Sequence, residues 1–116
     1  MIDAANVTTS FELPGLIVVH NMGLVRGMVL RLPHPPEGFK AALSKPSKVD
    51  LVALNADALT LYRELCEKAR EEAFENMLQH AAQLGANAVI GVRYDANQVT
   101  QGVTEVLAYG TAVLVR

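Results

Sequence analysis

The sequence has little of what usually marks a specialised class of protein. Among its 116 residues there is one cysteine and no tryptophan, and aromatic residues make up 5% of the chain. A single cysteine excludes a disulfide framework within the chain and any local two-cysteine metal motif. Charged residues reach only 19% while hydrophobic residues reach 51%, a balance that excludes intrinsic disorder. The length fits one domain spanning residues 1–116.

Long apolar runs and basic clusters are also missing. The longest apolar run, residues 106–115, is broken by Gly110 and is about half of the roughly 20 residues that a membrane-spanning helix needs. The ten basic residues are scattered and the net charge is −2, whereas nucleic-acid binding needs a basic surface. Residues 1–10 lack the basic and apolar segments of a signal peptide. We therefore expect a cytoplasmic protein that binds neither membrane nor nucleic acid.

The first part of the chain predicts a β-hairpin followed by a connection. Residues 16–20 and 24–32 are short apolar runs rich in Val and Leu, separated by residues 21–23, and such runs favour two paired strands. Three prolines within residues 33–36 end any strand, because proline lacks a backbone donor. We expect residues 33–56 to form a variable, proline-containing connection.

One long amphipathic helix is predicted for residues 57–84, because apolar positions recur there every three or four residues. The stripe consists of Tyr62, Cys66, Ala69, Ala73, Met77, His80 and Leu84. Gly85 follows directly and suits the left-handed conformation that ends many helices. At 1.5 Å per residue the helix would be roughly 40 Å long.

The remainder of the chain predicts two strands. Residues 88–95 alternate between two faces, residues 97–102 read as a polar turn, and residues 103–116 form a long final strand. Gly110 within that strand predicts a bulge or a point of close approach. The expected fold class is α+β, a small domain with a mainly antiparallel sheet and one long helix.

Both faces of the final strand are largely apolar beyond Val106, and so are residues 16–19. A sheet open to water on one side shows a polar face there, yet the chain offers only one substantial helix as cover. The second face must therefore be covered by another subunit or by closure of the sheet on itself. We expect a homo-oligomer.

Three residues are candidates for holding a transition-metal ion, namely His20, Cys66 and His80. Cys66 and His80 lie on one stripe of the helix but 14 positions apart, which is about 21 Å. Metal ligands lie within about 2.3 Å of the ion, so these two cannot share a metal within one chain. A site assembled between subunits stays open. The simpler interpretations are a buried thiol for Cys66 and a half-buried His80 hydrogen-bonded to Asn76.

Two other functions compete with a binding role. A small enzyme with its active site between subunits would place a carboxylate of raised pKa in a deep cleft. Its candidate residues are Arg70, Glu71, Arg93, Tyr94 and Asp95. The chain has no Gly-x-Ser-x-Gly elbow and no glycine-rich phosphate loop, so no catalytic residue is assigned. A structural or partner-binding module would use the proline-rich residues 33–36 as its contact.

Three runs of sequence carry a resemblance to a known family: residues 69–74 (AREEAF), 81–92 (AAQLGANAVIGV) and 109–113 (YGTAV). They resemble the YbjQ-like family, small bacterial proteins described as candidates for heavy-metal binding. The resemblance covers roughly residues 8–32 and 62–115. Between residues 33 and 61 a proline-rich stretch replaces the family's usual glycine-rich approach to the helix.

The resemblance implies a small α+β subunit that assembles into a ring-like homo-oligomer, a pentamer. It implies no particular activity and supplies no metal-ligand motif that can be placed on this chain. Our leading hypothesis is an uncharacterised, non-enzymatic oligomeric protein of the bacterial cytoplasm that binds a heavy metal or a small ligand. One His or Cys from each subunit, repeated around a ring axis, would complete a metal site that the single chain lacks.

Overall fold

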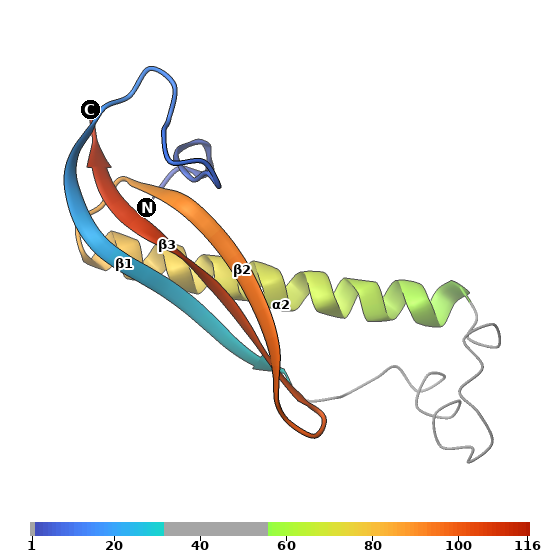
Figure 1. Ribbon diagram of the computed structural model, residues 1–116. Coiled ribbons are helices and arrows are strands. Elements are labelled where there is room, and N and C mark those ends of the chain that lie inside the picture. Colours follow the sequence, from blue (N-terminus) through green and yellow to red (C-terminus); the bar gives the residue numbers. More distant parts are fainter. Residues whose placement is uncertain (1, 32–55) are drawn as a thin grey trace, which may run out of the picture.

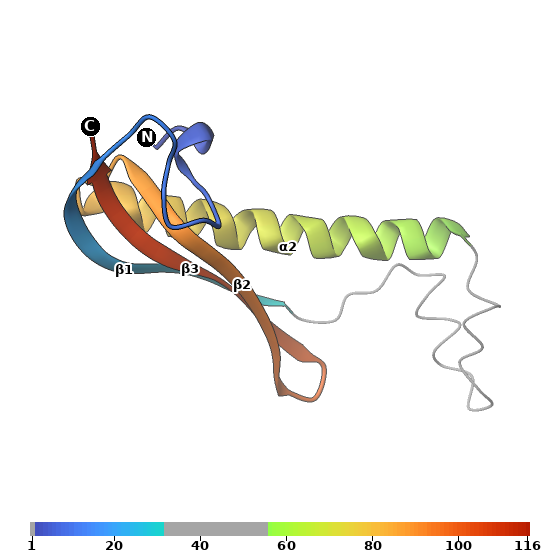
Figure 2. The same cartoon turned by 45° about the horizontal axis from the view of Figure 1, so that its top comes forward.

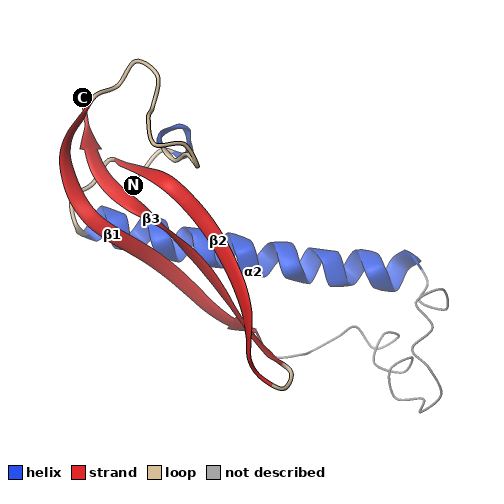
Figure 3. Ribbon diagram, in the orientation of Figure 1, coloured by secondary structure: helices blue, strands red, loops and turns tan. Residues whose placement is uncertain are grey.

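The computed structural model describes residues 2–31 and 56–116. After a short 3₁₀ turn, η1 (Ala4–Asn6), the elements are strand β1 (Val18–Arg31), helix α2 (Ala56–Gln83), and strands β2 (Ala88–Thr100) and β3 (Val103–Val115). The three strands form one curved antiparallel sheet, and α2 packs against one of its faces (Figures 1 and 3). The predicted α+β class is confirmed. The proline-containing connection lies outside the described residues apart from its last residue, which begins α2.

The sheet order is β1-β3-β2, so that β3 lies in the middle and pairs with both neighbours. The predicted hairpin of residues 16–20 and 24–32 is wrong, because residues 18–31 form the single strand β1, which pairs with β3. The Asn21 side chain accepts a hydrogen bond from the Gly23 N–H at 2.8 Å. Gly23 has a φ of +103°, and the register shifts there. The glycine that suggested a turn therefore makes a bulge.

The polar turn predicted for residues 97–102 is shorter than expected. Strand β2 continues to Thr100, and only Gln101 and Gly102 connect it to β3. Gly102 has a φ of +79°, a conformation that glycine adopts at little cost. The polar residues Asn97, Gln98 and Thr100 remain in the strand because they pair with β3, and the register shifts between Gln98 and Thr100.

Helix α2 packs on the sheet through small side chains. Ala69, Ala73, Met77 and Ala81 are buried at 6% exposure or less, while the N-terminal end of the helix extends past the sheet (Figure 2). The predicted helix end is confirmed: Gly85 has a φ of +87°. The N–H groups of Gly85 and Ala86 donate to the carbonyls of Ala82 and Ala81 at 3.0 and 3.1 Å. These two bonds form a Schellman motif.

The core lies between α2 and the sheet. Its sheet side is made by Val25, Val89, Ala108 and Ala112, each fully buried. Residues 7–10 protect the free edge of β2, since the N–H of Thr8 donates to the carbonyl of Val89 and the N–H of Val92 donates to the carbonyl of Thr8. A small second cluster on the other face joins Leu13 to β2 and β3.

The outer face of the sheet is apolar along β1. Leu24, Met28 and Leu30 alternate with the residues that face α2, and they are 63%, 50% and 56% exposed. Met28 pairs with Leu107 of β3 in the antiparallel register. The sequence placed apolar residues on both faces of residues 16–19 and of the final strand, and the structure adds this row on β1, in which Arg26 lies between Leu24 and Met28. Assembly into a ring stays a prediction.

Candidate functional site

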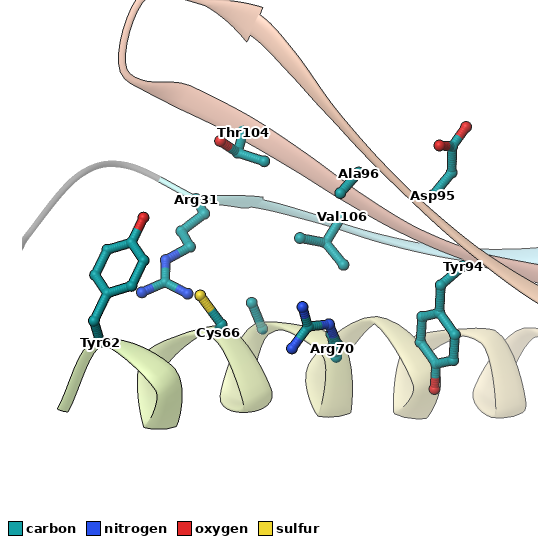
Figure 4. A pocket seen from close by; sticks show the side chains of 10 residues that line it. Arg31, Tyr62, Cys66, Arg70, Tyr94, Asp95, Ala96, Thr104 and Val106 are labelled. Atoms are coloured by element: carbon teal, nitrogen blue, oxygen red, sulfur yellow. The ribbon is translucent and has the colours of Figure 1, made fainter. Parts of the chain in front are cut away.

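A cleft opens where α2 and the sheet diverge. Sheets twist and curve while helices run straight, so the close packing that holds at Ala73 is lost beyond Ala69, toward the N-terminus of the helix. The cleft has a volume of about 240 Å³. It is lined by Tyr62, Cys66, Ala69 and Arg70 of α2, Arg31 of β1, Tyr94, Asp95 and Ala96 of β2, and Thr104 and Val106 of β3 (Figure 4).

Arg31 is the last residue of β1 and reaches from the sheet toward α2, between Tyr62 and Cys66 (Figure 4). Strand alternation brings it to the helix side, where Val25 and Val29 also pack. Its guanidinium carbon lies 5.7 Å from the centre of the Tyr62 ring, a cation–π geometry. Its Nη1 atom is buried and has no hydrogen-bond partner among the described residues.

Arg70 also borders the cleft, from α2, one helical turn after Cys66. Its Nη1 lies 2.8 Å from Oε1 of Glu67, and the two side chains are 52% and 70% exposed. An exposed pair of this kind contributes about 1 kcal/mol or less to stability. Arg70 is therefore free to turn toward a ligand without a large loss.

Tyr94 enters the cleft from β2. Partial burial raises the pKa of its hydroxyl, the negative charge of Glu67 raises this pKa further, and Arg70 lowers it. The hydroxyl therefore remains protonated at neutral pH and can donate a hydrogen bond. The neighbouring Asp95 points away from α2 (Figure 4), so the only carboxylate among the lining residues is turned out of the cleft.

The three candidate metal ligands lie in different parts of the fold. Cys66 is half-buried in the cleft, and His20 is exposed on β1 opposite Leu114. His80 is in the last turn of α2, where its Nδ1 accepts the N–H of Arg26 at 3.3 Å. In residues 2–31 and 56–116 no three His, Cys, Asp or Glu side chains gather as a metal site would require. One subunit does not bring these ligands together.

The sequence suggested a hydrogen bond between His80 and Asn76. In the structure His80 is instead hydrogen-bonded to the edge strand β1. Asn76 instead donates from Nδ2 to the carbonyl of Met28 at 3.5 Å. Together the two helix side chains reach backbone groups of Arg26 and Met28 on the free edge of β1. Such cover protects an edge strand from unwanted pairing.

The residues proposed for an enzyme site are only partly brought together. Arg70 and Tyr94 share the cleft, and both also line a shallow groove with Glu71. Arg93 donates to the carbonyls of Thr9 and Val92, each at 2.8 Å. Its guanidinium carbon lies 5.8 Å from the Phe11 ring centre. Arg93 therefore holds the N-terminal segment.

Sequence reasoning missed Arg31 as a cleft residue. The available signal was its position in an alternating strand, in phase with Val25, Gly27 and Val29. Thr104 was missed in the same way, in phase with Val106. Neither signal predicts a cleft, because the cleft depends on how far α2 lies from the end of the sheet.

Comparison with known proteins identifies the family. A family model described as "Putative heavy-metal-binding" matches residues 5–116. The chain belongs to the YbjQ-like family. A UPF0145 protein of Solibacter usitatus is 48% identical over 107 residues, covering 92% of this chain and 88% of the relative. Another, from Chromobacterium violaceum, is 48% identical over 113 residues, covering 97% of this chain and 90% of the relative.

A solved structure shares the fold of this YbjQ-like chain. It is the crystal structure of a DUF74-family protein of unknown function from Pediococcus pentosaceus. The TM-score is 0.58 at 17% identity, covering 95% of this chain and 96% of the other. At this level of identity the comparison supports the fold alone. The family is uncharacterised, and within the described part of the chain no helix is long and apolar enough to cross a membrane.

The heavy-metal description does not fit the residues of one subunit that the structure describes. Soft metal ions prefer thiolate and imidazole ligands, and structural zinc sites use four of them. The cleft offers the single thiol of Cys66, with Arg31 and Arg70 among the lining residues. Two guanidinium groups oppose the approach of a metal cation. The two candidate histidines, His20 and His80, are not among the residues that line the cleft.

Proposed function

We propose that this YbjQ-like protein is a homo-oligomeric binding protein whose site for a small ligand is the cleft between α2 and the sheet. The observation that carries this proposal is the composition of the cleft. Apolar walls from Ala69, Ala96 and Val106 surround a few polar side chains, and this combination is typical of small-molecule sites.

The orientation and pairing of the acidic side chains near the cleft favour binding over catalysis. The commonest general bases are a neutral histidine and a carboxylate, which would have to be directed into the cleft. Asp95 points away from α2 (Figure 4), and Glu67 is exposed and paired with Arg70. The Tyr94 hydroxyl is protonated at neutral pH, as in any tyrosine, and burial, which raises its pKa, makes it a still weaker acid. These features support recognition of a ligand more than proton transfer.

The exposed apolar face supports assembly. Leu24, Met28 and Leu30 form a row along the outer face of β1, each at least half exposed, with Arg26 between the first two. Exposed apolar side chains grouped on one face mark interaction sites. We infer that a second copy of the chain covers this row. The pentameric ring implied by the family resemblance and the bacterial cytoplasm are further parts of the proposal. A metal site built from His20, Cys66 or His80 of several subunits stays a prediction.

Native mass spectrometry of the untagged protein tests assembly and co-purified ligand together. We expect an oligomer, five subunits for the proposed ring. Met28→Glu should shift it to smaller species, because it puts a charge into the apolar row. Gln79→Glu adds the same charge on the exposed side of α2 and should leave the oligomer intact. A wild-type monomer would contradict the oligomeric part of the proposal.

An NMR fragment screen tests the cleft itself. We expect at least one small molecule to shift the amide signals of Cys66, Ala69 and Val106 in a saturable manner. Ala96→Phe should abolish these shifts by filling the cleft. Asn97→Phe adds the same ring at the next strand position, on the other face of the sheet, and should preserve them. A screen of charged and neutral fragments that yields no saturable ligand would contradict the binding role.

A further inference from the structure

The charges that line the cleft are not balanced. Two of the lining residues, Arg31 and Arg70, are cations, and the acid among them, Asp95, points away from α2 (Figure 4). Arg70 has a partner in Glu67. Arg31 forms no ion pair within the part of the chain that the structure describes. The interior of the cleft is therefore positive.

Arg31 is also short of hydrogen-bond acceptors. Its Nη1 is buried without a partner among the described residues, and a buried donor left unpaired is costly, more so when it carries charge. The Tyr62 ring, 5.7 Å from the guanidinium carbon, stabilises the cation and leaves its N–H groups unused. An acceptor that enters the cleft would satisfy this donor.

The shape of a guanidinium selects among acceptors. Its planar fork matches a carboxylate or a phosphate, which accept two parallel hydrogen bonds. The remaining walls, at Ala69, Ala96 and Val106, are apolar and suit a small carbon body attached to the anion. At about 240 Å³ the cleft is below the roughly 300–1,000 Å³ of drug-sized sites, so the ligand is small.

We infer that the cleft binds a small organic anion, a phosphate or a carboxylate, held by Arg31 from β1 and supported by Arg70 from α2. The inference rests on the proposed function, because it names the ligand class for the same cleft. It also differs from the family's heavy-metal description, since the same two side chains that attract an anion repel a metal cation.

Phenyl phosphate and benzoate are the anionic probes, and benzamide is a neutral probe of similar size. Each is titrated into the intact protein at fixed ionic strength, and the amide signals of Cys66, Ala69 and Val106 are followed by NMR. We expect saturable shifts with the anions and much weaker shifts with benzamide. Arg31→Gln should weaken anion binding about tenfold or more, because it removes a charged hydrogen bond.

Arg116→Gln is the matched control. Arg116 is exposed and pairs through its backbone with Ile17, at the end of the sheet away from the cleft, so the variant loses the same charge at a distance. It should keep the affinity within about twofold. Should Arg31→Gln fail to fold, Arg70→Gln replaces it. Arg70 is half exposed, and its loss should weaken binding several-fold.

The outcomes separate the two proposals. Equal affinity in wild type and the cleft variants, or equal weakening in Arg116→Gln, would overturn the anion site. Benzamide binding that Ala96→Phe abolishes, without anion binding, would overturn the anion site and leave the binding role standing. An absence of saturable binding by all three probes would overturn the anion site, and the wider fragment screen then decides the binding role.

Discussion

Replacing Gly27 with alanine should destabilise the fold strongly, because β1 and α2 touch backbone to backbone at this position. A Cβ built on Gly27 meets the carbonyl oxygen of Ala73 and the amide nitrogen of Met77, and it lies 2.9 Å from the carbonyl carbon of Asn76. None of these atoms belongs to a side chain that could rotate away. The helix or the strand must move to admit one methyl group.

The expected loss is about 3 kcal/mol, at the upper end of what one extra methyl costs in a packed core. Domains of this kind have a total stability of about 5–15 kcal/mol, so the variant should still fold. At about 4 °C per kcal/mol for this chain length, the melting temperature should fall by about 12 °C. Circular dichroism melts and urea titrations measure the change, at one protein concentration because assembly contributes to stability.

Gln79→Ala is the control for this prediction. It alters an exposed residue of α2, the helix that Gly27 contacts, and should change the melting temperature by about 2 °C or less. A Gly27→Ala protein that melts within about 2 °C of wild type would show that β1 and α2 are not in close contact. The same result would remove the basis for placing the cleft where the two elements separate.

Three further predictions concern other parts of the molecule. Met77 is fully buried against the sheet, so Met77→Ala should cost about 2–5 kcal/mol in a urea titration by leaving a cavity. The side chain of Asn87 donates to the carbonyl of Val115 at 2.9 Å and accepts its N–H at 2.7 Å, so Asn87→Ala should cost about 1–3 kcal/mol. The pKa of Tyr94 is raised in the folded state, chiefly by burial. Above pH 10 the unfolded chain therefore releases this proton first, so stability should fall as the pH rises, and Tyr94→Phe should reduce that fall.

Each of these has an internal comparison. Gln79→Ala, on the exposed side of α2, should cost little, and an equal loss in both helix variants would argue against burial of Met77. Asn87→Asp keeps the acceptor and loses the donor, so it should lie between wild type and Asn87→Ala. For Tyr94, urea titrations at pH 8 and at pH 11 give the loss of unfolding free energy between these two pH values. An identical loss in wild type and Tyr94→Phe would contradict the raised pKa.

Local patterns in the sequence were sufficient for α2 and for the presence of β2 and β3. The three- and four-residue spacing from Cys66 to Met77 specifies which helix face is buried, because the period of a helix does not depend on its surroundings. Gly85 marks the helix end for a similar reason, since the left-handed conformation that ends a helix disfavours residues with a Cβ. These features follow from a few neighbouring residues.

The bulge in β1 and the end of β2 depend on backbone pairing with β3, which the sequence does not show. Gly23 is consistent with a turn or with a bulge, and only the long register of β1 against β3 selects the bulge. Residues 97–100 are polar enough for a loop, yet they extend β2 because β3 supplies hydrogen-bond partners for their backbone. A backbone group pairs with whatever lies beside it in space, so these choices are made by the fold.

The cleft is the clearest case of a feature that arises from the packing of distant elements. Patterns along the chain were enough to predict the helix stripe, the helix end, the apolar faces of the strands and the resemblance to the family. The sequence separated Cys66 and His80 by distance along a helix, and the structure agrees. It could not join Arg31 to Cys66, Arg70 and Tyr94, because these residues come from three elements whose spacing is set by the curvature of the sheet against a straight helix.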